Sequence, residues 1–162
     1  MRRVLPLLVV MLAGCRSDVY RGSDLQKVVL HEHSAVIEQQ MTLLKKGQAA
    51  EMIRQLGERA FDPAKFEAFR DQAQALLETS LKVGGPVKSY QIVEAEKITN
   101  QTDRGPNGKP GTEARPATHD GVIVRLDVQF ERASADFEYR FLLSDGIWKS
   151  AGLTIKFRAA SE

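Results

Sequence analysis

The chain has 162 residues, with 23 Lys and Arg against 21 Asp and Glu, three His and one Cys. Arg2 and Arg3 supply two of the basic residues, so the remainder of the chain is electrically balanced. A balanced chain lacks the clustered positive charge that neutralises nucleic-acid phosphates, and a single cysteine excludes a disulfide within the chain. The length suits one domain with a core of its own.

The first fourteen residues are typical of a secretory signal peptide. Arg2-Arg3 precede an apolar run over residues 4–12, which is too short to span a bilayer, and the small residues Ala13-Gly14 follow. The sequence Leu12-Ala13-Gly14-Cys15 resembles the lipobox of bacterial lipoproteins. This resemblance implies cleavage before Cys15 and attachment of lipid to that cysteine, and two or more acyl chains would hold the protein stably at a membrane.

The same resemblance predicts where the protein lies. In lipoproteins of this type an Asp directly after the lipidated cysteine signals retention in the inner membrane, and here Arg16 stands at that position. We therefore expect the inner leaflet of the outer membrane, facing the periplasm. Residues 15–23 are polar and short, and we expect them to form a mobile lipidated tether.

Helical periodicity dominates the next part of the chain. Apolar residues at helical spacing predict one helix over residues 25–44, with Ser23 or Asp24 as its N-cap, and another over residues 48–59. Asp62-Pro63 predicts the start of a third helix, with Asp62 as N-cap, that runs toward residue 81. Gly84-Gly85-Pro86 ends this helical half. The apolar positions of the third helix are Phe66, Phe69, Ala73, Leu76 and Leu77.

Beyond Pro86 apolar and polar residues alternate, which is typical of β-strands with one buried face. We expect about four antiparallel strands, over residues 89–98, 122–131, 137–143 and 147–157. Ser144-Asp145-Gly146 predicts a hairpin turn, and Gly152 predicts a bulge or bend. Asp127 falls on the polar face of its strand, where we expect it to pair with a basic residue such as Arg140.

Helices followed by antiparallel strands predict an α+β domain with the helices on one face of the sheet. The element order, the Gly85-Pro86-Val87-Lys88-Ser89 entry to the sheet and the Gly146-Ile147-Trp148-Lys149 hairpin resemble the nuclear-transport-factor-like, cystatin-like cone fold. The resemblance implies a curved sheet within a single domain over residues 24–158, followed by a tail at 159–162. Residues 100–120 replace a tighter connection between the first two long strands, and we predict either a flexible hairpin extension or a partner-docking loop.

Four residues are candidates for a pocket between helices and sheet: His33, Tyr90, Tyr139 and Trp148. Cone-fold enzymes often use a carboxylate or a His-Asp pair, and this resemblance points to His33, Tyr90 and Asp127. The alternative for Tyr139 and Trp148 is packing in the core and at the sheet edge. Because the chain has no Gly-x-Ser-x-Gly turn and its one cysteine is a predicted acylation site, we predict no catalytic residue.

The three histidines invite comparison with metal sites. His31 and His33 are two residues apart on a predicted helix, so they point about 200° apart and cannot bind one ion from that helix. His119 could join one of them only through the tertiary fold. We expect no metal and no cofactor.

Two functional hypotheses remain open. The first is a non-enzymatic interaction or scaffold module of the cell envelope, monomeric or weakly dimeric, that is anchored through Cys15 and docks another envelope protein. The second is a small-ligand-binding protein or cone-fold enzyme, which requires a well-formed cavity at His33 or Tyr90.

Overall fold

The structure, a computed structural model, describes residues 18–102 and 117–158. The predicted signal peptide, Cys15, the predicted tail and residues 103–116 lie outside the described residues. Predictions that concern those segments therefore stay predictions.

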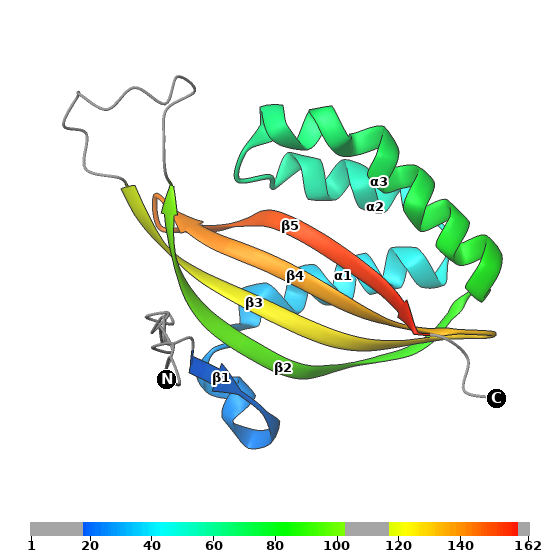
Figure 1. The fold of residues 1–162 in the computed structure, drawn as a ribbon, viewed down its shortest axis with the longest axis horizontal. Coiled ribbons are helices and arrows are strands. Elements are labelled where there is room, and N and C mark those ends of the chain that lie inside the picture. The colour runs from blue at the N-terminus through cyan, green and yellow to red at the C-terminus, as the bar shows by residue number, and fades with distance from the viewer. Residues whose placement is uncertain (1–17, 103–116, 159–162) are drawn as a thin grey trace, which may run out of the picture.

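The described residues form an α+β domain in which helices cover one face of an antiparallel sheet (Figure 1). Five strands follow one another in the order β1-β2-β3-β4-β5, so each strand pairs with its neighbour in the chain. Their bounds are β1 Asp18–Tyr20, β2 Val87–Thr102, β3 Ala117–Phe130, β4 Ser134–Ser144 and β5 Ile147–Arg158.

The prediction of four strands was too low by one. The additional strand, β1, lies within the predicted tether and pairs with β2 through Asp18 opposite Lys97 and Tyr20 opposite Ala95. The Lys97 ammonium lies 5.9 Å from the centre of the Tyr20 ring, and Arg21 forms an ion pair with Glu94 of β2. These contacts fix a segment whose polar composition had suggested a mobile tether.

The long β2–β3 hairpin extends further than predicted. Asn100 pairs with His119 and Thr102 pairs with Ala117, so both ends of the predicted insertion at residues 100–120 belong to strands. Only residues 103–116 remain between the two strands, and these lie outside the described residues.

The β4–β5 hairpin confirms the predicted turn at Ser144-Asp145-Gly146 and the predicted bulge at Gly152. Asp145 and Gly146 have φ angles of 54° and 76°, as a tight two-residue hairpin turn requires. The register between β4 and β5 shifts where Arg140 pairs with Gly152 and Phe141 with Ser150, which leaves Ala151 without a partner in β4. This shift is the bulge that Gly152 predicted.

The first predicted helix is divided in two. A 3-10 helix, η1, covers Gly22–Lys27, and α1 begins only at His31 and continues to Lys45. Between them Val28 turns inward and is buried, while Leu30 is extended with ψ 162°. Burial of Val28 in the core stabilises the break between the two helices.

Helix α2 covers Ala49–Glu58 and α3 covers Pro63–Gly84, close to their predicted bounds. Asp62 is the N-cap of α3, because its carboxylate accepts a hydrogen bond from the Lys65 amide at 3.0 Å. Gly57 allows α2 and α3 to approach closely, since a Cβ at this position would lie 2.7 Å from the Phe66 ring.

The core lies between the helices and the inner face of the sheet. Every second residue of β3 and β4 is buried there, opposite one face of α1 and the buried face of α2, which consists of Ala49, Met52, Ile53 and Leu56. The largest fully buried apolar side chains are Tyr139, Phe137, Phe141, Ile37, Met41, Leu44, Met52, Ile53, Leu77 and Leu126.

The other face of the sheet carries a cluster of charges. Arg125 bonds Glu138 at 2.9 Å and Glu96 at 3.0 Å, and it also pairs with Glu94. The predicted pair of Asp127 with Arg140 does not form, and Asp127 pairs with Arg158 instead. Arg140 lies opposite Ile123, four residues before Asp127 in β3, which explains why the predicted pair does not form.

Candidate functional site

A groove of about 750 Å³ lies between α3 and β5. Figure 1 shows α3 standing above the outermost strand of the sheet along much of its length. Many of the apolar side chains on the groove come from these two elements, and Ile53 and Leu56 of α2 and Leu142 of β4 also line it. The side chains from α3 and β5 are Phe66, Phe69, Ala73, Leu76 and Leu77 of α3, and Leu153 and Ile155 of β5.

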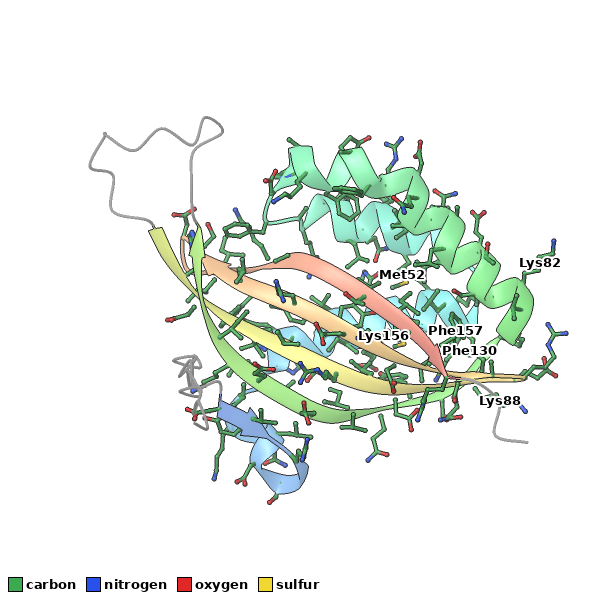
Figure 2. All side chains as sticks on the ribbon, viewed as in Figure 1. Met52, Lys82, Lys88, Phe130, Lys156 and Phe157 are labelled. Atoms are coloured by element: carbon green, nitrogen blue, oxygen red, sulfur yellow. The ribbon has the colours of Figure 1, made fainter. Side chains whose placement is uncertain are left out.

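Two of the groove residues expose large apolar surfaces. Phe69 is 59% exposed and Leu76 is 50% exposed, although both belong to the apolar face predicted for the third helix. Side chains of this kind are unfavourable in water, and their grouping beside a groove is typical of a binding surface. At the far end of β5 the ring of Phe157 lies 5.5 Å from that of Phe130 and is also partly exposed (Figure 2).

Positive charge lies at one end of the groove. Lys65 and Arg140 line it together with Asp62, whose carboxylate is engaged as the N-cap of α3. Arg140 lies opposite Gly152 in β5, and a glycine presents no side chain between Arg140 and the sheet edge. This end of the groove therefore suits an acidic group.

The predicted pocket residues partly come together, but in the core. His33 is fully buried, with ring centres 4.9 Å from Phe141 and 4.5 Å from Trp148. Tyr139 stacks on the same Phe141 ring, with the two ring centres 6.1 Å apart. Tyr90 is half-buried and lies under the Lys45 ammonium, 5.5 Å from the ring centre.

The environment of His33 keeps its imidazole neutral. Burial lowers the pKa of His33 from 6.5 to about 4. Its Nδ1 accepts a hydrogen bond from the Leu30 amide at 3.2 Å, and a proton on Nδ1 would abolish this bond. His33 thus stabilises the start of α1 as a neutral acceptor, a role that suits a structural residue.

Burial also raises the pKa values of Tyr139 and Tyr90, with a nearby Glu38 adding to the effect at Tyr90. Both phenols are protonated at neutral pH. Among the described residues, three buried polar atoms lack a hydrogen-bond partner: His33 Nε2, Gln40 Oε1 and the Tyr139 hydroxyl.

Replacement of Tyr139 by Phe tests whether these buried polar atoms bind anything. Since the hydroxyl has no protein partner among the described residues, we expect Tyr139→Phe to leave the free energy of unfolding unchanged or to raise it by about 1 kcal/mol. Chemical denaturation measures this change. A loss of stability in Tyr139→Phe would instead reveal a partner for the hydroxyl and would favour a ligand pocket.

Neither described hollow is lined by His33, Tyr90 or Tyr139. Trp148 borders a second hollow of about 490 Å³ near the start of β1, which mixes Asp18, Lys27 and Lys97 with apolar side chains. Asp127 lies with Arg158 on the opposite sheet face from the core and takes no part in either hollow.

The part of the chain that the structure describes contains no cluster of side chains suited to bind a metal ion. No group of three or more His, Cys, Asp or Glu side chains there is placed to hold an ion. His119 makes other contacts: its Nδ1 lies 3.0 Å from the Leu143 carbonyl oxygen, and its ring packs edge-on against the Phe61 ring.

The groove was not predicted from the sequence. The apolar positions of the third helix were recognised, but periodicity does not reveal what covers an apolar face. One signal was available: the predicted third helix carries two phenylalanines, Phe66 and Phe69, in its first half, ahead of Leu77, which enters the core.

Comparison with known proteins identifies no relative. No protein-family model matches the chain, and neither the curated proteins nor the solved structures give a match. Among the described helices, none combines the length and the apolar character needed to cross a bilayer.

Proposed function

We propose that the protein is a lipid-anchored, non-enzymatic interaction module of the cell envelope that docks a partner protein in the α3–β5 groove. The observation that carries this proposal is the groove itself, with the exposed side chains of Phe69 and Leu76 along it. An apolar groove with a charged end offers affinity through burial and orientation through charge.

The anchor rests on Leu12-Ala13-Gly14-Cys15, and the place in the envelope rests on Arg16. We propose that lipid on Cys15 holds the protein at the inner leaflet of the outer membrane, facing the periplasm. We also propose that the α+β domain is a member of the cystatin-like cone folds, a proposal supported by the helix-then-strand order and the meander of antiparallel strands.

The alternative, a small-ligand-binding protein or cone-fold enzyme, has less support. It requires a cavity at His33 or Tyr90, whereas His33 is packed between Phe141 and Trp148. Catalysis by His33 would also require a group that reaches solvent or substrate, and its side chain is fully buried.

Replacement of Cys15 by Ser tests the anchor. We expect Cys15→Ser to accumulate as a precursor that retains the signal peptide and carries no acyl chain, because serine lacks the thiol that receives the lipid. Mass spectrometry of the purified chain measures both features. Arg16→Asp is the matched control: it should still be cleaved and acylated but should move to the inner membrane. Normal cleavage and acylation of Cys15→Ser would exclude the lipoprotein assignment.

The groove is tested by cross-linking on intact membranes. Phe69→Asp places a charge among apolar contacts, and the lost burial should weaken partner binding by roughly tenfold to a hundredfold. We expect cross-linked protein adducts with the wild type and their loss in Phe69→Asp. Val93→Asp is the control, since Val93 is 41% exposed on β2, three strands away from β5. Equal adduct yields from all three proteins would contradict docking in this groove.

A further inference from the structure

The outer edge of β5 already accepts one hydrogen-bonded neighbour. The segment before α3 forms a parallel bridge between Ala60 and Ser150. The Phe61 amide donates to the Ser150 carbonyl oxygen at 2.7 Å, and the Ser150 amide donates to the Arg59 carbonyl oxygen at 2.8 Å. The backbone groups of Ser150 therefore point away from β4.

The strand register shows which other residues point the same way. Ser150 lies opposite Phe141 of β4, and the two kinds of antiparallel pair alternate along a strand. Leu153, Ile155 and Phe157 lie opposite Tyr139, Phe137 and Ala135, which are at successive second positions from Phe141. The backbone N–H and C=O groups of these three β5 residues therefore also point outward.

This part of the edge is open within residues 18–102 and 117–158. No backbone group of another described element bonds Leu153, Ile155 or Phe157 on that side, whereas Ser150 has both its partners. Figure 1 shows β5, in orange-red, as the last strand of the sheet, with α3 above it. An unpaired row of this kind is a template for an added strand.

The groove lies beside the same open edge. Leu153 and Ile155 line it from β5 while Phe69 and Leu76 line it from α3. A strand bonded to the β5 edge would present every second side chain to α3, so main-chain bonds and apolar contacts would act together.

Charge distinguishes among possible occupants. The basic end, with Lys65 and Arg140, lies next to Ser150 and Gly152. A second copy that paired antiparallel about Ile155 would place its Arg158 opposite Gly152, close to Arg140, which is a like-charge contact. A foreign segment with an acidic group at this end meets the opposite charge instead.

We propose that the partner contributes an extended segment that adds an antiparallel strand to β5 at Leu153, Ile155 and Phe157, with alternating apolar side chains facing α3 and an acidic group near its C-terminal end at Lys65 and Arg140. This inference rests on the proposed function, because it names the kind of partner that the groove binds.

A displayed library of random nine-residue peptides, selected on the purified lipidated protein, tests the proposal. We expect enrichment of peptides with apolar residues at alternate positions and an acidic residue near the C-terminus. In the complex with the most enriched peptide, the amides of Leu153, Ile155 and Phe157 should gain protection from hydrogen exchange, because each would donate to the peptide.

Two variants at one position separate backbone pairing from side-chain contact. Ile155→Pro removes an outward N–H that a folded edge strand does not need, and it should weaken binding of the enriched peptide by roughly tenfold more than Ile155→Ala, which keeps the N–H. Circular dichroism checks that both variants fold. If Ile155→Pro does not fold, the amide protection in the wild type decides the question alone.

The other outcomes overturn the proposal in distinguishable ways. Enriched peptides with helical spacing of apolar residues, and protection confined to α3, would exclude strand addition but leave groove docking intact. A dimer of the protein that dissociates in Ile155→Pro would show that a second copy occupies the edge. Failure to enrich any peptide would exclude strand addition, and failure of the Phe69→Asp cross-linking test as well would exclude the proposed function.

Discussion

Acidification from pH 6.5 to pH 4 is expected to lower the free energy of unfolding by about 3 kcal/mol through His33 alone. Burial among Phe141 and Trp148 lowers the pKa of His33 to about 4, whereas the unfolded chain takes up this proton near the ordinary value of 6.5. Between these values the unfolded state binds more protons than the folded state. The contribution of the neutral His33 side chain to the free energy of unfolding is therefore fully present above pH 6.5 and is lost as the pH falls toward 4.

Denaturant unfolding across this pH range measures the effect in the wild type and in His33→Phe. Phenylalanine retains the ring contacts but does not titrate, so most of the pH dependence should disappear. His31→Gln is the matched control, because His31 is exposed on the same helix and should leave the pH dependence unchanged. Parallel loss of stability in the wild type and His33→Phe would show that other groups, and not His33, cause the acid sensitivity.

Gly85→Ala is expected to cost at least about 2 kcal/mol of stability. Gly85 has φ 77° and ψ −170°, a conformation that side chains strongly disfavour. A Cβ at this position would also lie 2.9 Å from the Glu131 Cβ. The chain cannot easily move away, because the Glu131 amide donates to the Pro86 carbonyl oxygen and the Arg132 amide donates to the Gly84 carbonyl oxygen.

Gly47→Ala separates backbone strain from this overlap. Gly47 also has a positive φ, 71°, but a Cβ there would meet nothing within 4 Å. We expect Gly47→Ala to cost about 1 kcal/mol, the usual penalty for a side chain in this region. Thermal or denaturant unfolding of both variants gives the comparison, and equal costs would mean that the contact with Glu131 relaxes freely.

Local sequence signals predicted those parts of the fold in which a few neighbouring residues determine the geometry. Asp62-Pro63 correctly predicted the N-cap and start of α3, and Asp145-Gly146 correctly predicted the hairpin turn. Alternation in β3 and β4 correctly predicted the buried face, because every second residue of a strand points the same way.

Features that depend on long-range contacts were missed. The break at Val28 depends on a core that forms elsewhere in the chain, and β1 depends on β2, more than seventy residues away, for its hydrogen bonds. The partner of Asp127 depends on the register of two other strands, so Arg158 could not be identified before the sheet was known.

The candidate site shows the same limit. His33, Tyr139 and Trp148 were candidates for a pocket from their residue types, with core or sheet-edge packing as the alternative for Tyr139 and Trp148, and the tertiary fold buries His33 and Tyr139 in a packed interior. The groove arises because α3 stands away from β5, and no local pattern encodes that separation. Residue type identified candidates for binding, whereas the arrangement of α3 and β5 determines where binding is feasible.

Native mass spectrometry of the lipidated protein, gently extracted from its own membranes, measures bound mass without assuming its chemistry and therefore tests whether a protein occupies the groove. We expect an additional mass of protein size in the wild type and in Val93→Asp that is absent in Phe69→Asp. An additional small-molecule mass that persists in Phe69→Asp, with no protein-sized addition in any of the three proteins, would exclude docking of a partner protein in the groove.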